Sequence, residues 1–273
     1  MKKLLILLLL ATTLILVSFN PTCFFGMIRH DVDIEKYMEI GKQSKYDCVG
    51  RYSISESKED YAVGVLISSQ WVLTAAHFVQ DSSVWKFGGN FYRTKRIIKH
   101  PKLQPNAEET QWTGWDMALV ELEDPVLDIV PVQRYRGNAE LGKIITKLGY
   151  GFVGNGKEGM LIPKIQKRLG GQNTIDAVGG IFEEREFSTS VMVCDFDNPE
   201  NPESNRFGSP IPLELEIGGS KGDSGGGVFM EDHGTTVLVG IVSGALNRQI
   251  KYGSVLALAR VSKANEWIDS VID

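Results

Sequence analysis

Short runs rich in β-branched and aromatic residues, each ended by turn-forming residues, follow one another along most of this 273-residue chain. These runs lie at residues 61–68, 71–75, 92–98, 117–122, 144–150, 190–194, 228–229, 236–243 and 254–261. Many short strands at this spacing indicate a sandwich or a barrel and argue against alternating strands and helices. The 29 glycines are consistent with a fold of many short strands, because glycine is a frequent turn residue. We therefore predict an all-β fold, in which antiparallel barrels would remove the exposed edges of such strands.

Two segments have a helical pattern instead. A short helix is expected around residues 34–40, and a C-terminal helix is expected near Ser262, whose side chain can cap it. Apolar residues recur in this second helix at helical spacing, so it should dock on the core: Val261, Ala264, Trp267, Ile268, Val271 and Ile272. Residues 124–137 form the expected connection between two halves. We accordingly predict a first domain over residues 23–130 and a second over residues 131–273.

The first 22 residues have the layout of a secretory signal peptide. Lys2 and Lys3 precede an apolar run over residues 4–17, and polar or turn-forming residues follow it. This run is shorter than the roughly 20 apolar residues of a transmembrane helix, and no later segment is apolar enough to span a membrane. We predict a secreted or extracytoplasmic protein; an uncleaved N-terminal anchor and a lipid on Cys23 stay open as alternatives. In an oxidising compartment Cys48 and Cys194 could form a disulfide or remain two buried thiols.

The charge balance excludes one class of partner. Lys and Arg number 29 against 34 Asp and Glu, which gives a formal net charge of −5. A nucleic-acid surface needs a concentrated positive field, so no nucleic-acid partner is expected. The histidines lack the spacing of a zinc site, and the acidic stretch 195–203 fits a solvated loop better than a calcium site. We predict no metal and no cofactor.

Three short motifs carry reactive side chains. Residues 71–77 run from an apolar strand through small residues to His77, and residues 115–122 place Asp116 directly before an apolar run. A carboxylate buried there would need hydrogen bonds. Residues 218–228 surround Asp223 and Ser224 with glycines, which permit a sharp turn and leave backbone N–H groups free. Each motif alone also fits a purely structural role: a core histidine, an aspartate that begins a strand, and a glycine linker.

Together the three motifs supply a nucleophile, a base and a group that orients the base. A serine hydroxyl is a weak nucleophile at neutral pH and needs a neighbouring base to accept its proton. Histidine suits that task because its pKa lies near the working pH. A buried aspartate on the other ring nitrogen fixes the tautomer and stabilises the imidazolium.

In residue types and in order, the three motifs resemble those of the chymotrypsin/trypsin-like serine proteases. The matching residues are Thr74-Ala75-Ala76-His77, Asp116-Met117-Ala118-Leu119 and Gly222-Asp223-Ser224-Gly225-Gly226. They follow that family's order of histidine, aspartate and serine, and the likeness covers roughly residues 49–273. The resemblance implies two antiparallel six-stranded β-barrels with a C-terminal α-helix and an active site between the barrels.

The same resemblance implies a role for each site residue. Ser224 would attack a peptide carbonyl carbon, His77 would act as base and then as acid, and Asp116 would orient His77. The backbone N–H groups of Gly222 and Ser224 would form the oxyanion hole. Three residues would line the substrate cleft: Gly218, Ser243 and Gly244. The implied activity is that of a serine endopeptidase acting on proteins or peptides, and Ser243 would also support Asp116.

The chain departs from the family's pattern in two respects. In the family, the mature N-terminus is usually an aliphatic-Gly-Gly sequence, and its ammonium pairs with the aspartate before the serine. No such sequence precedes His77 here. The partner of Asp223 could therefore be a new chain end near Ile28, another cation or a set of backbone donors. Gly218 stands where the family members that cleave after Lys or Arg carry an aspartate at the floor of the pocket. A preference for Lys or Arg is therefore not expected. A protease-like binding or regulatory protein without turnover, and an esterase, remain alternatives. The sequence does not indicate the oligomeric state.

Overall fold

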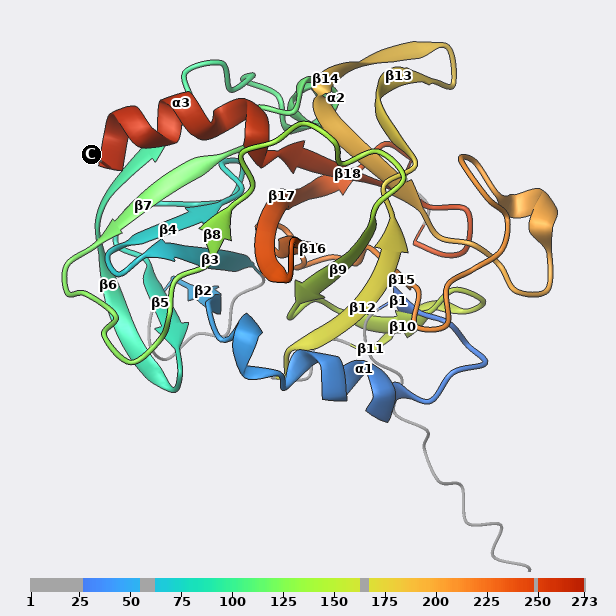
Figure 1. Ribbon diagram of the computed structural model, residues 1–273, viewed down its shortest axis with the longest axis horizontal. Coiled ribbons are helices and arrows are strands. Elements are labelled where there is room, and N and C mark those ends of the chain that lie inside the picture. The colour runs from blue at the N-terminus through green and yellow to red at the C-terminus, as the bar shows by residue number, and fades with distance from the viewer. Residues whose placement is uncertain (1–26, 55–61, 163–166, 248–249, 273) are drawn as a thin grey trace, which may run out of the picture.

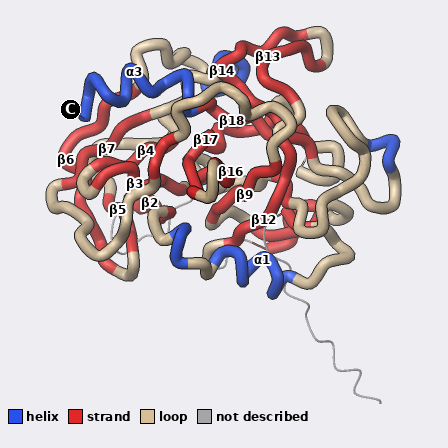
Figure 2. The backbone as a smooth tube through the Cα atoms, viewed as in Figure 1, coloured by secondary structure: helices blue, strands red, loops and turns tan. Residues whose placement is uncertain are grey.

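A computed structural model describes residues 27–54, 62–162, 167–247 and 250–272 of the chain (Figure 1). The predicted signal peptide over residues 1–22 and Cys23 lie outside the described residues. Most described elements are strands, and helices lie at the periphery (Figure 2). The all-β prediction is therefore confirmed.

The first half is a closed six-stranded barrel. Its strands are β2 (Val49–Ser53), β3 (Val63–Ser68), β4 (Trp71–Thr74), β5 (Val84–Phe87), β6 (Asn90–Lys99) and β7 (Ala118–Leu122). They close in the order β2-β3-β4-β7-β6-β5, and each pair of neighbouring strands is antiparallel. This barrel lies at the left of Figure 1. The strands β3, β4 and β7 are buried along nearly their whole length, which explains their continuous apolar runs.

The second half is also built on antiparallel pairs but has more strands than the six expected. Within the described residues it is an eight-stranded sheet of order β12-β9-β16-β17-β18-β14-β13, with β8 paired in parallel to β17. The elements are β8 (Gln133–Arg134), β9 (Ile144–Gly149), β12 (Leu169–Thr174), β13 (Ala177–Phe182), β14 (Arg185–Asp195), β16 (Gly227–Asp232), β17 (Thr235–Ala245) and β18 (Val255–Arg260). The sheet curls so that Asp176 N, just past β12, donates to Val193 O of β14 at 2.9 Å. The two-residue β8 is too short to give a sequence signal.

A four-stranded sheet, which the sequence does not predict, joins the start of the described chain to the second half. It contains β1 (Met27–Ile28), β10 (Val153–Asn155), β11 (Gly159–Ile162) and β15 (Ile217–Gly218) in the order β11-β10-β1-β15. Strand β1 is parallel to β10 and antiparallel to β15. Residues 27 and 28 thus lie between two other strands and are fully buried.

The helices match the sequence in part. Helix α1 (Ile34–Gly41) forms as predicted, and Asp33 caps it by accepting a hydrogen bond from Glu35 N. Helix α2 (Ala107–Thr113) and the short 3-10 turns η1 (Ser44–Tyr46) and η2 (Pro202–Ser204) are not predicted. Among the described residues, no helix is both long and apolar enough to cross a membrane.

Helix α3 (Val261–Ile272) packs its apolar stripe on the core, as expected. The predicted cap is wrong: the helix begins directly after β18, so Ser262 lies inside its first turn. The Ser262 hydroxyl instead donates to Glu140 Oε1 at 2.7 Å. The main apolar cluster runs from the first barrel through Leu148 and Ile241 to α3, so the two halves share one core.

Cys48 and Cys194 are buried free thiols rather than a disulfide. Cys48 belongs to the core cluster of the first barrel, and Cys194 belongs to a separate cluster in the second half. Burial raises the pKa of the Cys48 thiol to about 12 and also raises the pKa of Cys194. Neither thiol is therefore poised for thiolate chemistry.

The acidic stretch that follows β14 is not uniformly solvated, which corrects the sequence interpretation. Asp195 and Asp197 are buried, whereas Glu200 and Glu203 are exposed. Burial, with the nearby Asp195 carboxyl, raises the pKa of Asp197 to about 7, and burial raises that of Glu216 to about 8. Within the described ranges, no three acidic, cysteine or histidine side chains are grouped so as to hold a metal ion.

Candidate active site

His77 lies at the end of a buried strand of the first barrel. Strand β4 ends at Thr74, and the fully buried Ala75 and Ala76 lead into a turn that carries the histidine. Small side chains let this turn lie close to the barrel. The His77 side chain is 23% exposed, and its ring packs edge to face on Phe78. One face of the imidazole is thus held by the protein while the ring remains accessible.

Asp116 comes to the same end of the barrel because β4 and β7 are antiparallel neighbours. Thr74 pairs with Ala118, so the residue before β7 meets the residues after β4. The Asp116 side chain is 0% exposed. Its Oδ1 accepts a hydrogen bond from His77 N at 3.0 Å, and its Oδ2 lies 2.7 Å from His77 Nδ1. A fully buried carboxylate that holds both the backbone and the ring fixes the orientation of the imidazole.

Ser243 of the second half completes the set of donors to this carboxylate. Its Oγ donates to Asp116 Oδ2 at 2.6 Å. Ser243 lies on β17, so the contact joins the two halves across the site. Charge-assisted hydrogen bonds are the stronger kind, and this one adds to the stability of the ionised carboxylate.

The Ser224 loop is seated against the first barrel. Ser224 O accepts a hydrogen bond from Val63 N at 2.9 Å, and Thr74 Oγ1 donates to Val63 O at 2.6 Å. Gly225 has φ +80°, and a Cβ there would collide with Val63 O and Thr74 Oγ1. Glycine is therefore required at this position, both for its backbone conformation and for the close approach. The loop lies against Thr74, three residues before His77.

The groups of this loop that are expected to act on a substrate have no hydrogen-bond partner among the described residues. Within the described residues, no hydrogen bond joins the Ser224 hydroxyl to His77, and neither Gly222 N nor Ser224 N donates to another protein group. Gly222 has φ +91°, a conformation that favours glycine. Catalytic hydrogen bonds are often long before substrate binds, so this geometry is compatible with an active site at rest.

Sequence comparison then decides the family. The family model described as Trypsin matches residues 40–205, which is more than half of the chain and includes His77 and Asp116. The chain belongs to the trypsin family. The match ends before Ser224. The placement of Ser224 against the first barrel therefore rests on the structure alone.

Two relatives of this trypsin-family protein illustrate the extent of the likeness. A trypsin of Simulium vittatum is 42% identical over 74 residues, an alignment that covers 23% of this chain and 28% of that trypsin. The solved structure of neuropsin, a serine protease expressed in the limbic system of mouse brain, superposes with a TM-score of 0.61 at 17% identity. That superposition covers 85% of this chain and 97% of neuropsin, and it establishes the chymotrypsin-like fold.

The trypsin-family landmarks expected to line the substrate cleft have definite neighbours. Gly218 ends β15, its carbonyl accepts a hydrogen bond from Lys147 Nζ at 2.9 Å, and a Cβ there would lie 2.9 Å from the ring of Phe196. Gly244 lies on β17 against the side-chain amide of Gln111 from α2. Ser243 contacts another of the predicted site residues, because its hydroxyl donates to Asp116.

Sequence reasoning missed two residues that the structure brings to this trypsin-family site. Lys147 lies beside Asp223 and Gly218, and Gln111 covers Gly244. A lysine within the strand pattern Ile144-Ile145-Thr146-Lys147-Leu148 was a visible signal, since lysine is rarely buried without a partner. Nothing in the local sequence marks Gln111, whose position depends on how α2 packs.

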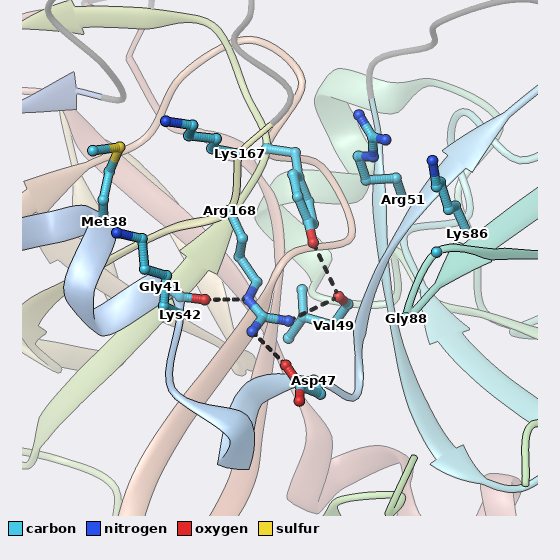
Figure 3. Close-up of a pocket in the computed structure, with 12 residues that line it drawn as sticks. Met38, Gly41, Lys42, Asp47, Val49, Arg51, Lys86, Gly88, Lys167 and Arg168 are labelled. Atoms are coloured by element: carbon cyan, nitrogen blue, oxygen red, sulfur yellow. Dashed lines mark hydrogen bonds and ion pairs between the residues drawn. The ribbon is translucent and has the colours of Figure 1, made fainter. Parts of the chain in front are cut away.

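A separate depression does not contain the predicted site residues. It has a volume of about 430 Å³ and lies between α1, the first barrel and the start of β12 (Figure 3). At its base the Arg168 guanidinium donates to Gly41 O and Tyr46 O, each at 2.6 Å, and to Asp47 Oδ1 at 2.8 Å. Arg168 thereby ties α1 and η1 to the second half, next to β12, the neighbour of the strand that carries Lys147.

Proposed function

We propose that this protein is a serine endopeptidase that hydrolyses peptide bonds in proteins or peptides. The observation that carries the proposal is the fully buried Asp116, bonded to His77 and to Ser243, together with the glycine-flanked Ser224 loop that is seated on Val63 of the same barrel. Burial of a carboxylate costs desolvation free energy. A carboxylate that orients an accessible imidazole, as in a serine protease, gives that burial a catalytic use. Membership of the trypsin family supports the same activity.

In the proposed mechanism, Ser224 Oγ attacks the carbonyl carbon while His77 Nε2 accepts the hydroxyl proton. The new C–O bond makes a tetrahedral oxyanion, which would accept hydrogen bonds from the N–H groups of Gly222 and Ser224. Collapse breaks the C–N bond, and the imidazolium gives its proton to the departing amine. A water molecule then gives a proton to His77 and attacks the acyl carbon; the C–O bond to Ser224 breaks, and the serine oxygen takes the proton back from His77. Asp116 keeps the Nδ1 proton in place through both halves.

The cleft does not favour a cationic side chain. Gly218 supplies no carboxylate, and the ammonium of Lys147 lies 2.9 Å from the Gly218 carbonyl oxygen. Because Lys147 is paired with Asp223 at 2.6 Å, neither side chain offers an uncompensated negative charge to attract a cationic side chain. We therefore propose that cleavage does not occur preferentially after Lys or Arg. The leader pattern of residues 1–22 further supports action outside the cytoplasm.

A peptide-library digest tests the activity and its preference together. The exported protein is incubated with a diverse peptide mixture, and the new termini are identified by mass spectrometry beside a Ser224→Ala control. We expect internal cleavages that require Ser224 and are not enriched after Lys or Arg. Equal digestion by the Ser224→Ala variant, or no cleavage by either protein, would refute the endopeptidase proposal. Strong enrichment after Arg would refute the preference alone.

A further inference from the structure

Lys147 is an unusual lysine because its side chain is 2% exposed. It lies on β9, in the interior of the second sheet, where it pairs with Gly171 of β12 on one side and Val228 of β16 on the other. Its backbone position is therefore fixed by two neighbouring strands. A buried ammonium is costly unless it is paired and hydrogen-bonded. The Lys147 Nζ satisfies this requirement with Asp223 Oδ2 at 2.6 Å and Gly218 O at 2.9 Å.

The Asp223 carboxylate, 4% exposed, is fully engaged by this lysine and by nearby donors. Its Oδ1 accepts from Gly151 N at 3.0 Å, and its Oδ2 also accepts from Ser220 N at 3.0 Å and Ser220 Oγ at 3.2 Å. A Cβ at Gly149 or Gly151 would collide with Oδ1. The carboxylate thus lies in a close-fitting cradle that already contains a cation.

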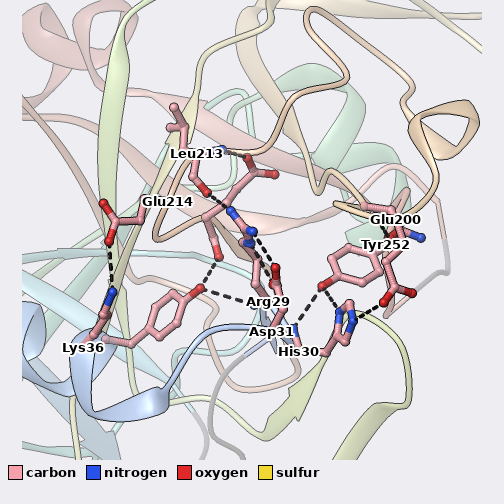
Figure 4. Close-up of polar contacts among 11 residues, drawn as sticks. Arg29, His30, Asp31, Lys36, Glu200, Leu213, Glu214 and Tyr252 are labelled. Carbon is pink, nitrogen blue, oxygen red and sulfur yellow. Dashed lines mark hydrogen bonds and ion pairs between the residues drawn. The ribbon is translucent and has the colours of Figure 1, made fainter.

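The first described residues of the chain are engaged elsewhere. Ile28 pairs with Ile217 in the small sheet, and its carbonyl accepts a hydrogen bond from Gly156 N at 3.0 Å. Arg29 donates to Leu213 O at 2.7 Å, and His30 N donates to the Tyr252 hydroxyl at 3.0 Å (Figure 4). These contacts hold the segment as an internal strand. Met27 pairs with Gly218, close to Lys147, but among the described residues no hydrogen bond joins this segment to the Asp223 carboxylate.

Asp223 directly precedes the nucleophile, so its position controls the loop. Asp223 N donates to Ser220 O, and Gly226 N donates to Asp223 O, which makes the residue the centre of the turn. Without a cation the buried carboxylate would be uncompensated, and rotation toward solvent would carry the 222–224 backbone with it. That movement would displace both the Ser224 hydroxyl and the Gly222 N–H.

We propose that Lys147 is the positioning residue that holds Ser224 and the oxyanion donors in their working arrangement, so that the site is assembled without a newly cut N-terminus. The inference rests on the proposed serine endopeptidase function. Of the three partners of Asp223 that the sequence leaves open, it selects another cation, and that cation is a lysine of the second sheet. The activity of this protein would then not depend on where the chain begins.

The test measures the rate of Ser224 labelling by a fluorophosphonate probe in the full-chain protein. Lys147→Met removes the charge and roughly keeps the length, and Lys147→Ala leaves a space that n-propylammonium matches. Lys95→Met is the matched control, because Lys95 also forms a lysine–carboxylate pair, with Glu121 at 2.7 Å, but its side chain is 56% exposed. Circular dichroism and thermal melts identify the folded fraction, to which each rate is normalised.

We expect Lys147→Met to label about 10²–10³-fold more slowly than the parent, the loss typical of a missing oxyanion donor, and Lys95→Met to label at the parent rate. Propylammonium should raise the rate of Lys147→Ala in a saturable manner, and n-propanol, which lacks the charge, should not. A merely structural lysine would lower the melting temperature but leave the normalised rate unchanged. The intact mass of the labelled parent should show chains that begin upstream of Ile28.

Folded Lys147→Met that labels within twofold of the parent would overturn the inference and leave the proposed function standing. Labelling confined to chains cut to a new N-terminus near Ile28 would overturn it in the same way. If the parent does not label in any form, the endopeptidase proposal fails, and the inference fails with it.

Discussion

Replacing Asp116 by asparagine should nearly abolish activity without unfolding the protein, and the hydrogen bonds show why. The amide has one oxygen and one NH₂ group in place of two carboxylate oxygens. Its oxygen must occupy the Oδ1 position, because the donor there is His77 N at 3.0 Å. The NH₂ group then occupies the Oδ2 position, where it faces His77 Nδ1 and the Ser243 hydroxyl.

An NH₂ group at that position is a donor, so His77 Nδ1 must become an acceptor and the ring proton must move to Nε2. The nitrogen that should take the Ser224 proton is then already protonated. The change also removes the charge that stabilises the imidazolium. Together these effects cost about 10⁴-fold in a triad of this kind, which corresponds to about 5.4 kcal/mol at 1.36 kcal/mol per tenfold.

The assay is the second-order rate of fluorophosphonate labelling for the parent, Asp116→Asn and Asp124→Asn. Asp124 is an exposed aspartate near the end of β7 and serves as the matched control. We expect a loss of about 10⁴-fold for Asp116→Asn, with an unchanged near-ultraviolet spectrum, and the parent rate for Asp124→Asn. A loss of less than tenfold in folded Asp116→Asn would refute the role assigned to this carboxylate.

Three further changes have defined outcomes. Ser243→Ala should slow labelling about 10- to 100-fold, because a hydrogen bond to a charged acceptor is worth about 1.5–3 kcal/mol; a loss below threefold would contradict its supporting role. Folding stability should fall as pH rises from about 4 to about 8, because burial holds the pKa of Asp197 at about 7 and that of Glu216 at about 8, above the ordinary values of 3.8 and 4.5. The protonated carboxyls stabilise the folded state at low pH, and this stabilisation is lost as pH rises through the raised pKa values. Thermal melts of Asp197→Asn should therefore show a smaller decline in stability with pH. An unchanged slope would contradict the predicted direction of the pH dependence. Arg260→Met should cost about 3–5 kcal/mol in urea unfolding, because Glu140, paired with Arg260 Nη2 at 2.6 Å, would be left as an unpaired buried charge; a cost below 1 kcal/mol would contradict the buried pair.

Much of the fold and the central residues of the site could be predicted from local sequence. The strands that carry His77 and Asp116 have continuous apolar runs, and the chain order of the motifs has few alternatives. The stripe of α3 recurs at helical spacing and docks as expected. These features depend on neighbouring residues, so the chain itself displays them.

Other features depend on contacts between distant segments, which no local pattern reports. The pairing of Met27 with Gly218 spans most of the chain, and the two-residue strands that result carry no periodicity. The burial of Asp197 against Glu216 likewise depends on how the loop after β14 folds back. Lys147 combines a local and a distant feature. Its place in an apolar strand can be seen in the sequence, but its partner Asp223 is 76 residues away.

The central claim is that Ser224 is an activated nucleophile. The most direct measurement is labelling of the purified protein without residues 1–22 by a fluorophosphonate probe, with Ser224→Ala beside it and the modified peptide identified by mass spectrometry. We expect one label per chain on Ser224 and none in the variant. No label in the parent, or an equal label in the Ser224→Ala variant, would contradict it.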